Sequence, residues 1–346
     1  MPANAVELRS TVPQNITVWG SYTIHYFEDC PQLHHITYLA ANTELLYPMR
    51  ITIFSRGPFL YSTQRLVAAG KERGHFIEVT DHGLCSPSLH GSKTALLLNG
   101  QPWEPPRVAI PRIGANITSR GVAIIRQLDV LGVPHTMNAE GLMLARDKMS
   151  SLQVLASHGV AVPRTVLCFT LGEVRMAGRA MANYPIVVKL LESTHGVGVA
   201  LANTPYQLER IAEGFLRIQD RVILQEFVEE SDGRDVRALV VGGKVVAAME
   251  RKAGEGEFRA NMHRGATARA VTLSPEDEAL ALRAAAIVGV EVAGVDLLPS
   301  DRGPLLMEVN ASPGLEGIEK ATRVDIAGAI IDYAVAKAHK KKQLIS

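Results

Sequence analysis

The stretch that decides the fold lies near the C-terminus, where residues 295–314 read VDLLPSDRGPLLMEVNASPG. Two short apolar runs flank a polar turn with proline and glycine, which is the pattern of a β-hairpin. If the turn centres near Arg302, Asp296 lies opposite Glu308. Asn310 shares the face of Glu308, because side chains alternate along a strand. Opposed carboxylates destabilise a sheet, whereas Mg²⁺ takes such oxygen ligands and shares them with phosphates. The hairpin therefore predicts a metal site in a nucleotide-using enzyme.

Composition is typical of a soluble globular protein. The 346 residues suffice for two or three small domains, and 47% of them are hydrophobic. A net charge of +1 gives no global field toward nucleic acid, and the three scattered cysteines suit a reducing compartment. No apolar run has the length of a membrane span, and the N-terminus lacks a signal-peptide core. We therefore expect a cytoplasmic protein with no membrane and no direct nucleic-acid role.

Residues 1–48 differ from the rest of the chain, because their aromatic and histidine residues show no clear period. We expect them to be an appended extension, either poorly ordered or lying before the true start at Met49. Residues 49–145 alternate strand and helix patterns, which predicts a small parallel α/β domain. The expected elements are strands at 49–55, 76–80 and 108–110, a helix ending at Gly74 and a helix over 121–131.

Residues 146–336 are expected to form a second, larger domain. Its predicted elements are a helix over 141–160, strands at 185–191 and 222–228, a hairpin over 235–249, a helix over 275–288 and the hairpin already described. Four lysines within 337–346 predict a solvated basic tail.

Three polar segments within the second domain suit a nucleotide site, although each has an ordinary alternative. Lys189 ends an apolar strand, and the glycine loop at 196–198 lets backbone N–H groups approach an anion. The alternative is a solvent-reaching lysine beside a common turn. Arginine forks in the loop at 259–264 suit phosphates or carboxylates, or the loop is merely polar surface. Lys148 and Glu226, each taken alone, fit a solvated surface better than a binding site.

The order of these segments is more informative than any one of them, and it resembles the ATP-grasp superfamily. Within it, the sequence is similar to the RimK family of ribosomal-protein glutamate ligases, from Met49 to about Tyr333. The phrases that carry the resemblance are PRIG at 111–114, RDK at 146–148, VVKL at 187–190, QEF at 225–227, FR at 258–259, HRG at 263–265, VAGVD at 292–296 and MEVNASPGLEGIE at 307–319.

The resemblance implies an α/β fold, an ATP-grasp domain of two α+β sandwich lobes preceded by a parallel pre-ATP-grasp domain. It also implies site residues. Those for ATP are Lys148, Lys189, Ser193, Gly196, Gly198, Glu226, Phe227, Asp235, Arg259, Ala260 and Asn261. Lys189 and Arg259 would be catalytic, and Asp296, Glu308 and Asn310 would hold two Mg²⁺ or Mn²⁺ ions. The hairpin pattern indicates the same three metal ligands without the family.

The implied reaction joins L-glutamate to a carboxylate. ATP phosphorylates the carboxylate to an acyl phosphate, which the amine of glutamate then attacks, so catalysis is mostly positioning and electrostatic stabilisation. The implied acceptor is the C-terminus of a ribosomal protein, small-subunit protein six. The sequence leaves open whether the chain forms a homo-oligomer.

Two departures from the family pattern bear on the substrates. Ser193 and His195 stand where glycine and glutamine are usual, and Ser119-Arg120 stand where aromatic residues are usual. The second departure lies on the substrate side, so the acceptor stays open. One alternative is a ligase that makes poly-glutamate or glutamylates a small-molecule cofactor. Another is a non-catalytic nucleotide-binding regulator, against which the intact metal and lysine residues argue.

Overall fold

The computed structural model describes residues 18–19, 22–23, 48–191, 198–254, 257 and 265–345. Contacts divide the chain into two compact units, 1–47 and 48–346. In the first unit, β1 (Val18–Trp19) pairs antiparallel with β2 (Tyr22–Thr23). The rest of the expected extension lies outside the described residues.

The second unit begins with the predicted parallel sheet, in the order β4-β3-β8. Its strands are β3 (Arg50–Phe54), β4 (Phe76–Thr80) and β8 (Val108–Pro111), with α2 (Tyr61–Glu72) and α3 (Thr118–Val130) alongside. Every residue of β8 is buried, as a central run of apolar side chains requires. The strand ends at Phe54, Thr80 and Pro111 lie along one edge of the sheet, where parallel α/β sheets bind ligands.

A small antiparallel sheet inserted after β4 was not predicted. It contains β5 (Cys85–His90), β6 (Lys93–Leu98) and β7 (Gln101–Pro102). Asn99 and Gly100 form its second turn, and both have positive φ angles of 51° and 77°. Asn-Gly between apolar runs is a strong hairpin signal in sequence, so this element was detectable.

The helix expected over 141–160 is instead two helices, α4 (Ala139–Arg146) and α5 (Lys148–Ser157). The break is at Asp147, whose extended backbone leaves the helix and whose Oδ1 accepts from Ser150 N at 2.9 Å. Aspartate is favoured at a helix N-cap because it satisfies an unpaired N–H group, and here it starts a new helix within one apolar pattern.

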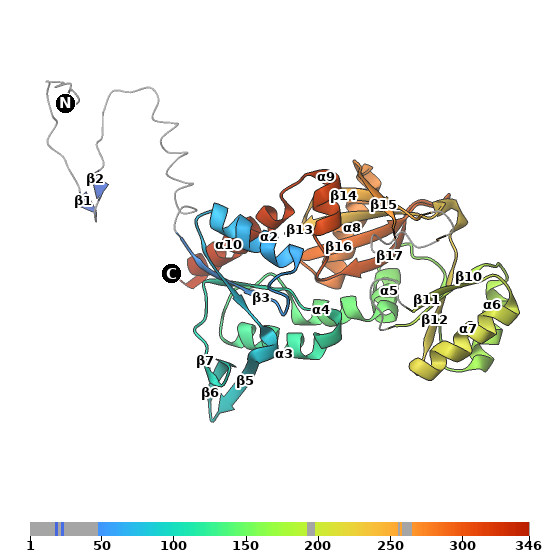
Figure 1. Ribbon diagram of the computed structural model, residues 1–346, viewed down its shortest axis with the longest axis horizontal. Helices are drawn as coiled ribbons and strands as arrows, with labels where there is room; N and C mark the ends of the chain where they lie inside the picture. The colour runs from blue at the N-terminus through green and yellow to red at the C-terminus, as the bar shows by residue number, and fades with distance from the viewer. Residues whose placement is uncertain are drawn as a thin grey trace, which may run out of the picture. The chain divides into compact units, whose positions relative to one another are not determined.

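The first of two following lobes has a four-stranded antiparallel sheet in the order β11-β10-β12-β9. Its elements are β9 (Thr165–Cys168), α6 (Leu171–Met181), β10 (Ile186–Lys189), β11 (Val199–Ala202), α7 (Pro205–Ile218) and β12 (Val222–Glu226). Ile186 and Val188 pack with the apolar sides of α6 and α7, which cover one face of the sheet (Figure 1). Alternation along the strand places Lys189 on the opposite face.

The second lobe has a five-stranded antiparallel sheet in the order β15-β14-β13-β16-β17. Its elements are β13 (Arg234–Val241), β14 (Lys244–Lys252), β15 (Thr267–Ala270), α8 (Pro275–Val288), β16 (Val292–Leu298), β17 (Leu305–Asn310) and α9 (Glu316–Thr322). The helix over 275–288 is as predicted. Val295 and Val309 pack with α8, so their neighbours Asp296 and Glu308 face the other way.

The lysines expected to form a basic tail instead continue α10 (Ile326–Ile345). Ile330, Ile331 and Ala334 of this helix pack with Leu66 and Ala69 of α2, and α10 lies beside α2 in Figure 1. Lys337 donates to both carboxylate oxygens of Glu291, at 2.7 and 2.6 Å. The C-terminal helix therefore covers the N-terminal part of the second unit.

Candidate active site

The predicted hairpin register is confirmed, since Asp296 pairs with Glu308 and Gly294 with Asn310 between β16 and β17. The carboxylate of Asp296 is buried, and Glu308 and Asn310 are half-buried beside it. A Cβ on Gly294 would lie 2.9 Å from Cβ of Pro313. Glycine here lets the chain after Asn310 fold back closely over the strand pair.

A balanced network of two arginines and two aspartates holds Asp296. Arg237 donates to both of its oxygens, at 2.7 and 2.6 Å, and Arg251 donates to Oδ2 at 3.1 Å. Arg251 also binds both oxygens of Asp235, at 2.6 and 2.8 Å. Burial alone would raise the pKa of Asp296, but Arg237 and Arg251 outweigh it and hold that pKa below its usual range. Asp296 is therefore ionised and fixed in orientation.

Strand register produces this network. Arg237 lies directly opposite Asp296 between β13 and β16, and Asp235 lies opposite Arg251 between β13 and β14. Asp235 was expected on the ribose side of the nucleotide, and both of its oxygens are bonded to Arg251. Burial raises the pKa of Asp235 against the pull of Arg251. Neither Arg237 nor Arg251 was a predicted site residue, although Arg237 stands two residues from Asp235 on one strand.

Lys189 lies on the open face of the first lobe's sheet, where its Nζ donates to Oε1 of Gln225 at 2.6 Å. Gln225 is buried and in turn donates to Oγ1 of Thr165 at 2.9 Å. Burial lowers the pKa of Lys189 to about 8; Glu308 opposes this shift and Lys148 adds to it. A half-buried ammonium whose hydrogen-bond partner is a neutral amide is well placed to receive a phosphate.

Lys148 is the first residue of α5, and its Nζ donates to the carbonyl oxygen of Leu191 at 2.8 Å, just beyond β10. Arg146, two residues earlier, is half-buried, and burial lowers its pKa against the opposing effect of Glu308. Lys189 and Arg146 are therefore each close enough to Glu308 for its charge to act on them, and Lys148 is close enough to Lys189 to lower its pKa. The chain supplies these cations from helices and from the first lobe.

Glu226 contacts both the start of β9 and the turn of the metal hairpin. Its Oε1 accepts from Arg164 N at 2.9 Å and from Nη2 of Arg302 at 2.8 Å. The neighbouring Phe227 is half-buried. The predicted adenine contacts of these two residues stay a prediction, and Glu226 has a visible second role in joining the two lobes.

Gly198 closes the base of the predicted phosphate loop. Its φ is +73°, its carbonyl accepts from Leu190 N at 2.8 Å, and a Cβ would lie 2.6 Å from Cδ1 of Leu190. Only glycine fits this backbone and this space. The other loop residues predicted to bind lie outside the described residues: Ser193, Gly196, Arg259, Ala260 and Asn261.

The hairpin residues have the chemistry of a magnesium site. Two carboxylates and an amide are hard oxygen ligands, suited to Mg²⁺ and Mn²⁺ alike. Oδ1 of Asp296 accepts one hydrogen bond from Arg237, so a carboxylate oxygen with two lone pairs retains room for a cation. Within the described ranges no three His, Cys, Asp or Glu side chains cluster as a metal site, so Asn310 would have to supply the third oxygen.

Comparison with known proteins shows the family to which the chain belongs. A family model described as RimK-like ATP-grasp domain matches residues 145–334, and one described as RimK PreATP-grasp domain matches residues 49–142. The chain belongs to the RimK family of ATP-grasp ligases. The RimK-like resemblance of the sequence is thus confirmed, and the protein is an ATP-dependent ligase.

This RimK-family chain spans nearly the whole length of its curated relatives. A probable alpha-L-glutamate ligase 1 of Hahella chejuensis is 46% identical over 294 residues, covering 85% of this chain and 97% of the relative. A probable alpha-L-glutamate ligase of Aliivibrio fischeri is 44% identical over 294 residues, covering 85% and 98%.

Solved structures confirm the ATP-grasp fold. PsnB, an ATP-grasp ligase complexed with minimal precursor, has a TM-score of 0.66 at 22% identity, covering 84% of this chain and 99% of PsnB. A RimK domain protein from Sphaerobacter thermophilus has a TM-score of 0.64 at 24% identity, covering 82% and 99%. In another solved structure, PsnB is complexed with Mg and ADP. Among the described helices of the RimK-family chain, none has the length and apolarity to cross a membrane.

Proposed function

We propose that the chain adds L-glutamate to the C-terminal carboxylate of a ribosomal protein, through an acyl phosphate. The observation that carries the proposal is that Lys189 of the first lobe lies close enough to Glu308 of the β16-β17 hairpin, and to Lys148 of α5, for both to affect its pKa. Candidate phosphate-binding cations therefore adjoin the candidate metal ligands. The names of the curated relatives support glutamate, and peptide-bound neighbours such as PsnB support a polypeptide acceptor.

The reaction requires two displacements. A carboxylate oxygen of the acceptor attacks the γ-phosphorus of ATP, the bridging P–O bond breaks, and ADP leaves. The amine of glutamate then attacks the acyl carbon, phosphate leaves, and the amine proton passes to solvent. Lys148 and Lys189 stabilise charge on the phosphates in both steps, since phosphoryl transfer depends mostly on positioning and electrostatics.

Asp296, Glu308 and Asn310 would hold the two Mg²⁺ or Mn²⁺ ions, which offset the charge of the phosphates when bound. The chain prepares for this by keeping Asp296 ionised between Arg237 and Arg251. A carboxylate fixed by its neighbours binds a ligand without further loss of side-chain freedom.

The test uses purified protein, ATP, Mg²⁺, isotopically labelled L-glutamate and purified small-subunit ribosomal proteins, with intact masses as the readout. We expect one ribosomal protein to gain a glutamyl residue or a multiple, and Glu308→Ala to abolish the gain. Glutamate chains formed without any change in a ribosomal protein would favour the poly-glutamate alternative. Absence of ATP turnover with every acceptor would favour the regulator.

Arg120 is a position at which the alternative acceptors can be tested. This exposed residue of α3 donates to the carbonyl of Gly83 at 2.5 Å, beyond the end of β4. It therefore lies on the ligand-binding side of the parallel sheet, where the family usually has an aromatic residue. Arg120→Tyr, assayed against ribosomal proteins and against free glutamate, shows whether this position selects the acceptor.

A further inference from the structure

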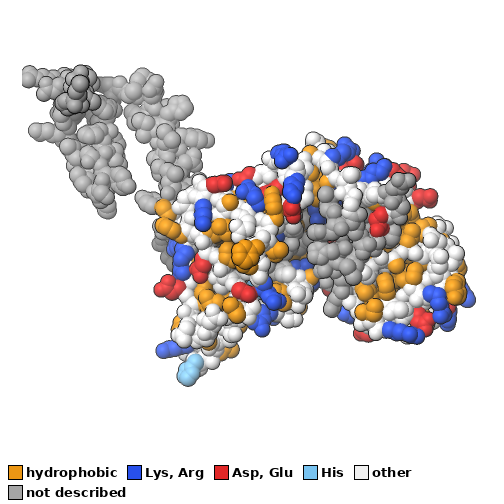
Figure 2. Space-filling model, in the orientation of Figure 1, with side chains coloured by type: hydrophobic (Ala, Val, Ile, Leu, Met, Phe, Trp, Pro, Cys, Tyr) orange, Lys and Arg blue, Asp and Glu red, His pale blue; other side chains and the backbone are white. Residues whose placement is uncertain are grey.

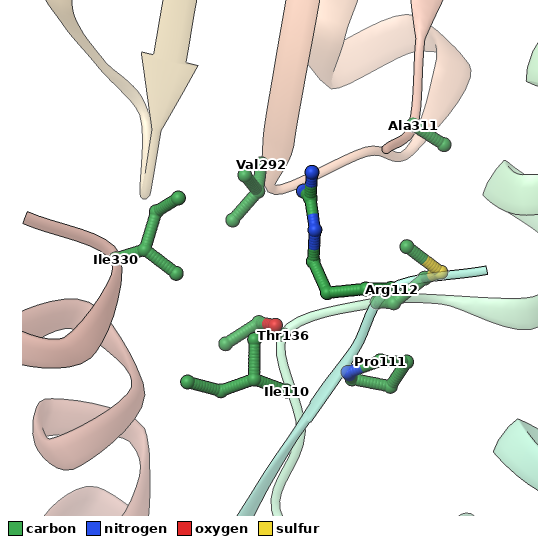
Figure 3. A pocket seen from close by; sticks show the side chains of 8 residues that line it. Ile110, Pro111, Arg112, Thr136, Val292, Ala311 and Ile330 are labelled. Atoms are coloured by element: carbon green, nitrogen blue, oxygen red, sulfur yellow. The ribbon is translucent and has the colours of Figure 1, made fainter. Parts of the chain in front are cut away.

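Arg112 occupies an unusual electrostatic position at the end of β8. Its side chain lies in a narrow pocket with its guanidinium between Val292 and Ala311, as Figure 3 shows. Nη2 donates to the carbonyl oxygen of Pro313, just beyond the metal hairpin. The residue therefore joins the parallel sheet to the second lobe at the strand edge where ligands bind.

The charge of Arg112 is not balanced by an acid. In the described part of the chain neither Arg112 nor Arg146 forms an ion pair, and each guanidinium donates to a backbone carbonyl instead: Pro313 for Arg112 and Ile113 for Arg146. Burial, with a further contribution from the neighbouring Arg146, lowers the pKa of Arg112 to about 10. Arg112 and Arg146 are thus two half-buried cations close enough for the charge of one to lower the pKa of the other.

Two polar atoms beside this pair also lack partners. Nε of Arg146 and Oγ of Ser312 are buried and find no hydrogen-bond partner among the residues that the structure describes. Ser312 directly precedes Pro313, to which Arg112 donates, and Arg146 donates to the residue after Arg112. The two unused groups therefore belong to residues next to the backbone on either side of the Arg112 contact.

Such an arrangement of charges is unfavourable. Buried charges normally have counter-ions, and an unpaired buried charge or donor costs several kcal/mol. An anion with at least two oxygens would remove the repulsion between the arginines and accept from the unused Nε. The Oγ of Ser312 would donate a further hydrogen bond. A planar carboxylate matches a guanidinium fork in this way.

We propose that Arg112, Arg146 and Ser312 form a carboxylate-binding subsite for one of the ligase's two carboxylate-bearing substrates. The proposal rests on the proposed function, because that reaction supplies two candidates: glutamate and the acceptor. The phosphates of ATP have their own cations in Lys148 and Lys189. Arg146 stands two residues before Lys148, so the subsite adjoins the place where the acyl phosphate would form.

The principal experiment measures kcat and KM for glutamate, for the acceptor and for ATP in Arg112→Met and Arg146→Met. A charge-assisted hydrogen bond contributes about 1.5–3 kcal/mol, or roughly tenfold to a hundredfold in affinity. We therefore expect the KM of one carboxylate substrate to rise about tenfold or more. We expect kcat and the KM for ATP to change by less than about fivefold. Which KM rises identifies the substrate.

Control variants separate binding from structure. Arg107→Met removes an exposed arginine just before the same strand and should change no constant. Arg112→Lys keeps the charge and should restore part of the affinity. If the methionine variants fail to fold, Arg112→Lys and Ser312→Ala carry the comparison, with an expected rise of a few-fold in the same KM. Unchanged KM for both carboxylate substrates in folded variants overturns the proposal.

A binding measurement separates this subsite from the ligase activity. Calorimetry tests L-glutamate, and a peptide with a free C-terminus against its C-terminal amide, on the parent protein and Arg112→Lys. A parent that ligates nothing but binds one carboxylate, with weaker binding by the variant, refutes the proposed function and retains the subsite. A parent that binds neither carboxylate refutes the subsite.

Discussion

Two charged regions of the second unit differ in how their charges are matched. In the network of Asp235, Asp296, Arg237 and Arg251, two acids meet two bases within one sheet. Around Glu308, by contrast, three cations gather from different elements: Lys148, Lys189 and Arg146. Among the residues that the structure describes, the first region pairs two acids with two bases, whereas the second sets several cations around one acid.

This difference distinguishes a region that fixes its own side chains from a region that can bind a ligand. A matched buried network fixes its side chains, since removing any member leaves a charge unpaired. A cluster of cations around a single acid, such as the cation cluster around Glu308, is a site for anions such as phosphates and carboxylates. On the face shown in Figure 2, basic and acidic side chains are interspersed.

The largest effect on activity is expected from removing Glu308, the acid of the cation cluster. Glu308→Ala takes away a proposed metal ligand and should lower ligase activity by at least about a hundredfold, the usual scale for a group that stabilises transition-state charge. The half-buried side chain should leave the fold intact. The rate of ADP release with acceptor present is the measurement.

Glu316→Ala is its matched control, because this exposed glutamate on α9 pairs with Lys320. It should retain parental activity. A Glu308→Ala variant that works within about threefold of the parent would remove Glu308 from the metal site.

Breaking the matched network should affect stability first. Arg251→Met leaves Asp235 and Asp296 buried with a single arginine, which should cost about 3–5 kcal/mol in the free energy of unfolding. Urea unfolding at neutral pH measures it. The loss should shrink in acid, where the carboxylates become neutral.

Arg269→Met is the control variant, because this exposed arginine of β15 binds Glu250 of the neighbouring strand β14. Its unfolding midpoint should match the parent. Equal midpoints for both variants would mean that the buried network contributes nothing.

Because the pKa of Lys189 is about 8, phosphate binding by the cation cluster around Glu308 should depend on pH. Below that pH the ammonium is charged and attracts phosphate, and above it the neutral amine does not. The dissociation constant for ADP, measured without divalent metal, should therefore rise by up to about tenfold per pH unit above 8. Titrations between pH 7 and 9.5 test this. Lys189→Arg stays charged throughout and should flatten the curve; an identical slope in that variant would assign the dependence to another group.

The smallest effect belongs to a charge pair outside both regions. Lys337 and Glu291 join α10 to the start of β16, with about a third of each side chain exposed. Lys337→Ala should cost at most about 1 kcal/mol in unfolding, as partly exposed pairs usually do, and leave activity unchanged. A loss as large as that of Arg251→Met would erase the distinction between matched burial and surface pairing.

Local pattern was sufficient for much of the fold. The parallel sheet, the helix over 275–288 and the pairing of Asp296 with Glu308 follow from short-range rules: apolar runs, caps and a turn. Lys148 and Lys189 required the order of motifs, because neither differs locally from a surface lysine. The binding roles at 193–198 and 259–261 stay predictions, and of these residues the structure describes Gly198 alone.

Other features depended on details that local pattern obscures. Asp147 interrupts an apolar period that continues on both sides, and so two helices looked like one. The pairing of Arg251 with Asp235 was not predicted for a different reason. The two-residue turn at Gly242-Gly243 pairs Val241 with Lys244, but a bulge between Leu239 and Val240 shifts the register and sets Asp235 opposite Arg251. A one-residue shift moves every side chain to the other face, so simple counting misses the partner.

The sequence by itself determined the hairpin, the placement of its three proposed oxygen ligands and the family, because these depend on residues close together along the chain or on their order. Only the tertiary structure decided the charge balance of each region. Arg112 binds the backbone at Pro313 and is affected by the charge of Arg146, and Lys189 is affected by the charge of Glu308, across separations that no spacing rule covers. Whether a buried cation has a partner is a property of three-dimensional packing, and that property distinguishes a scaffold from a binding site.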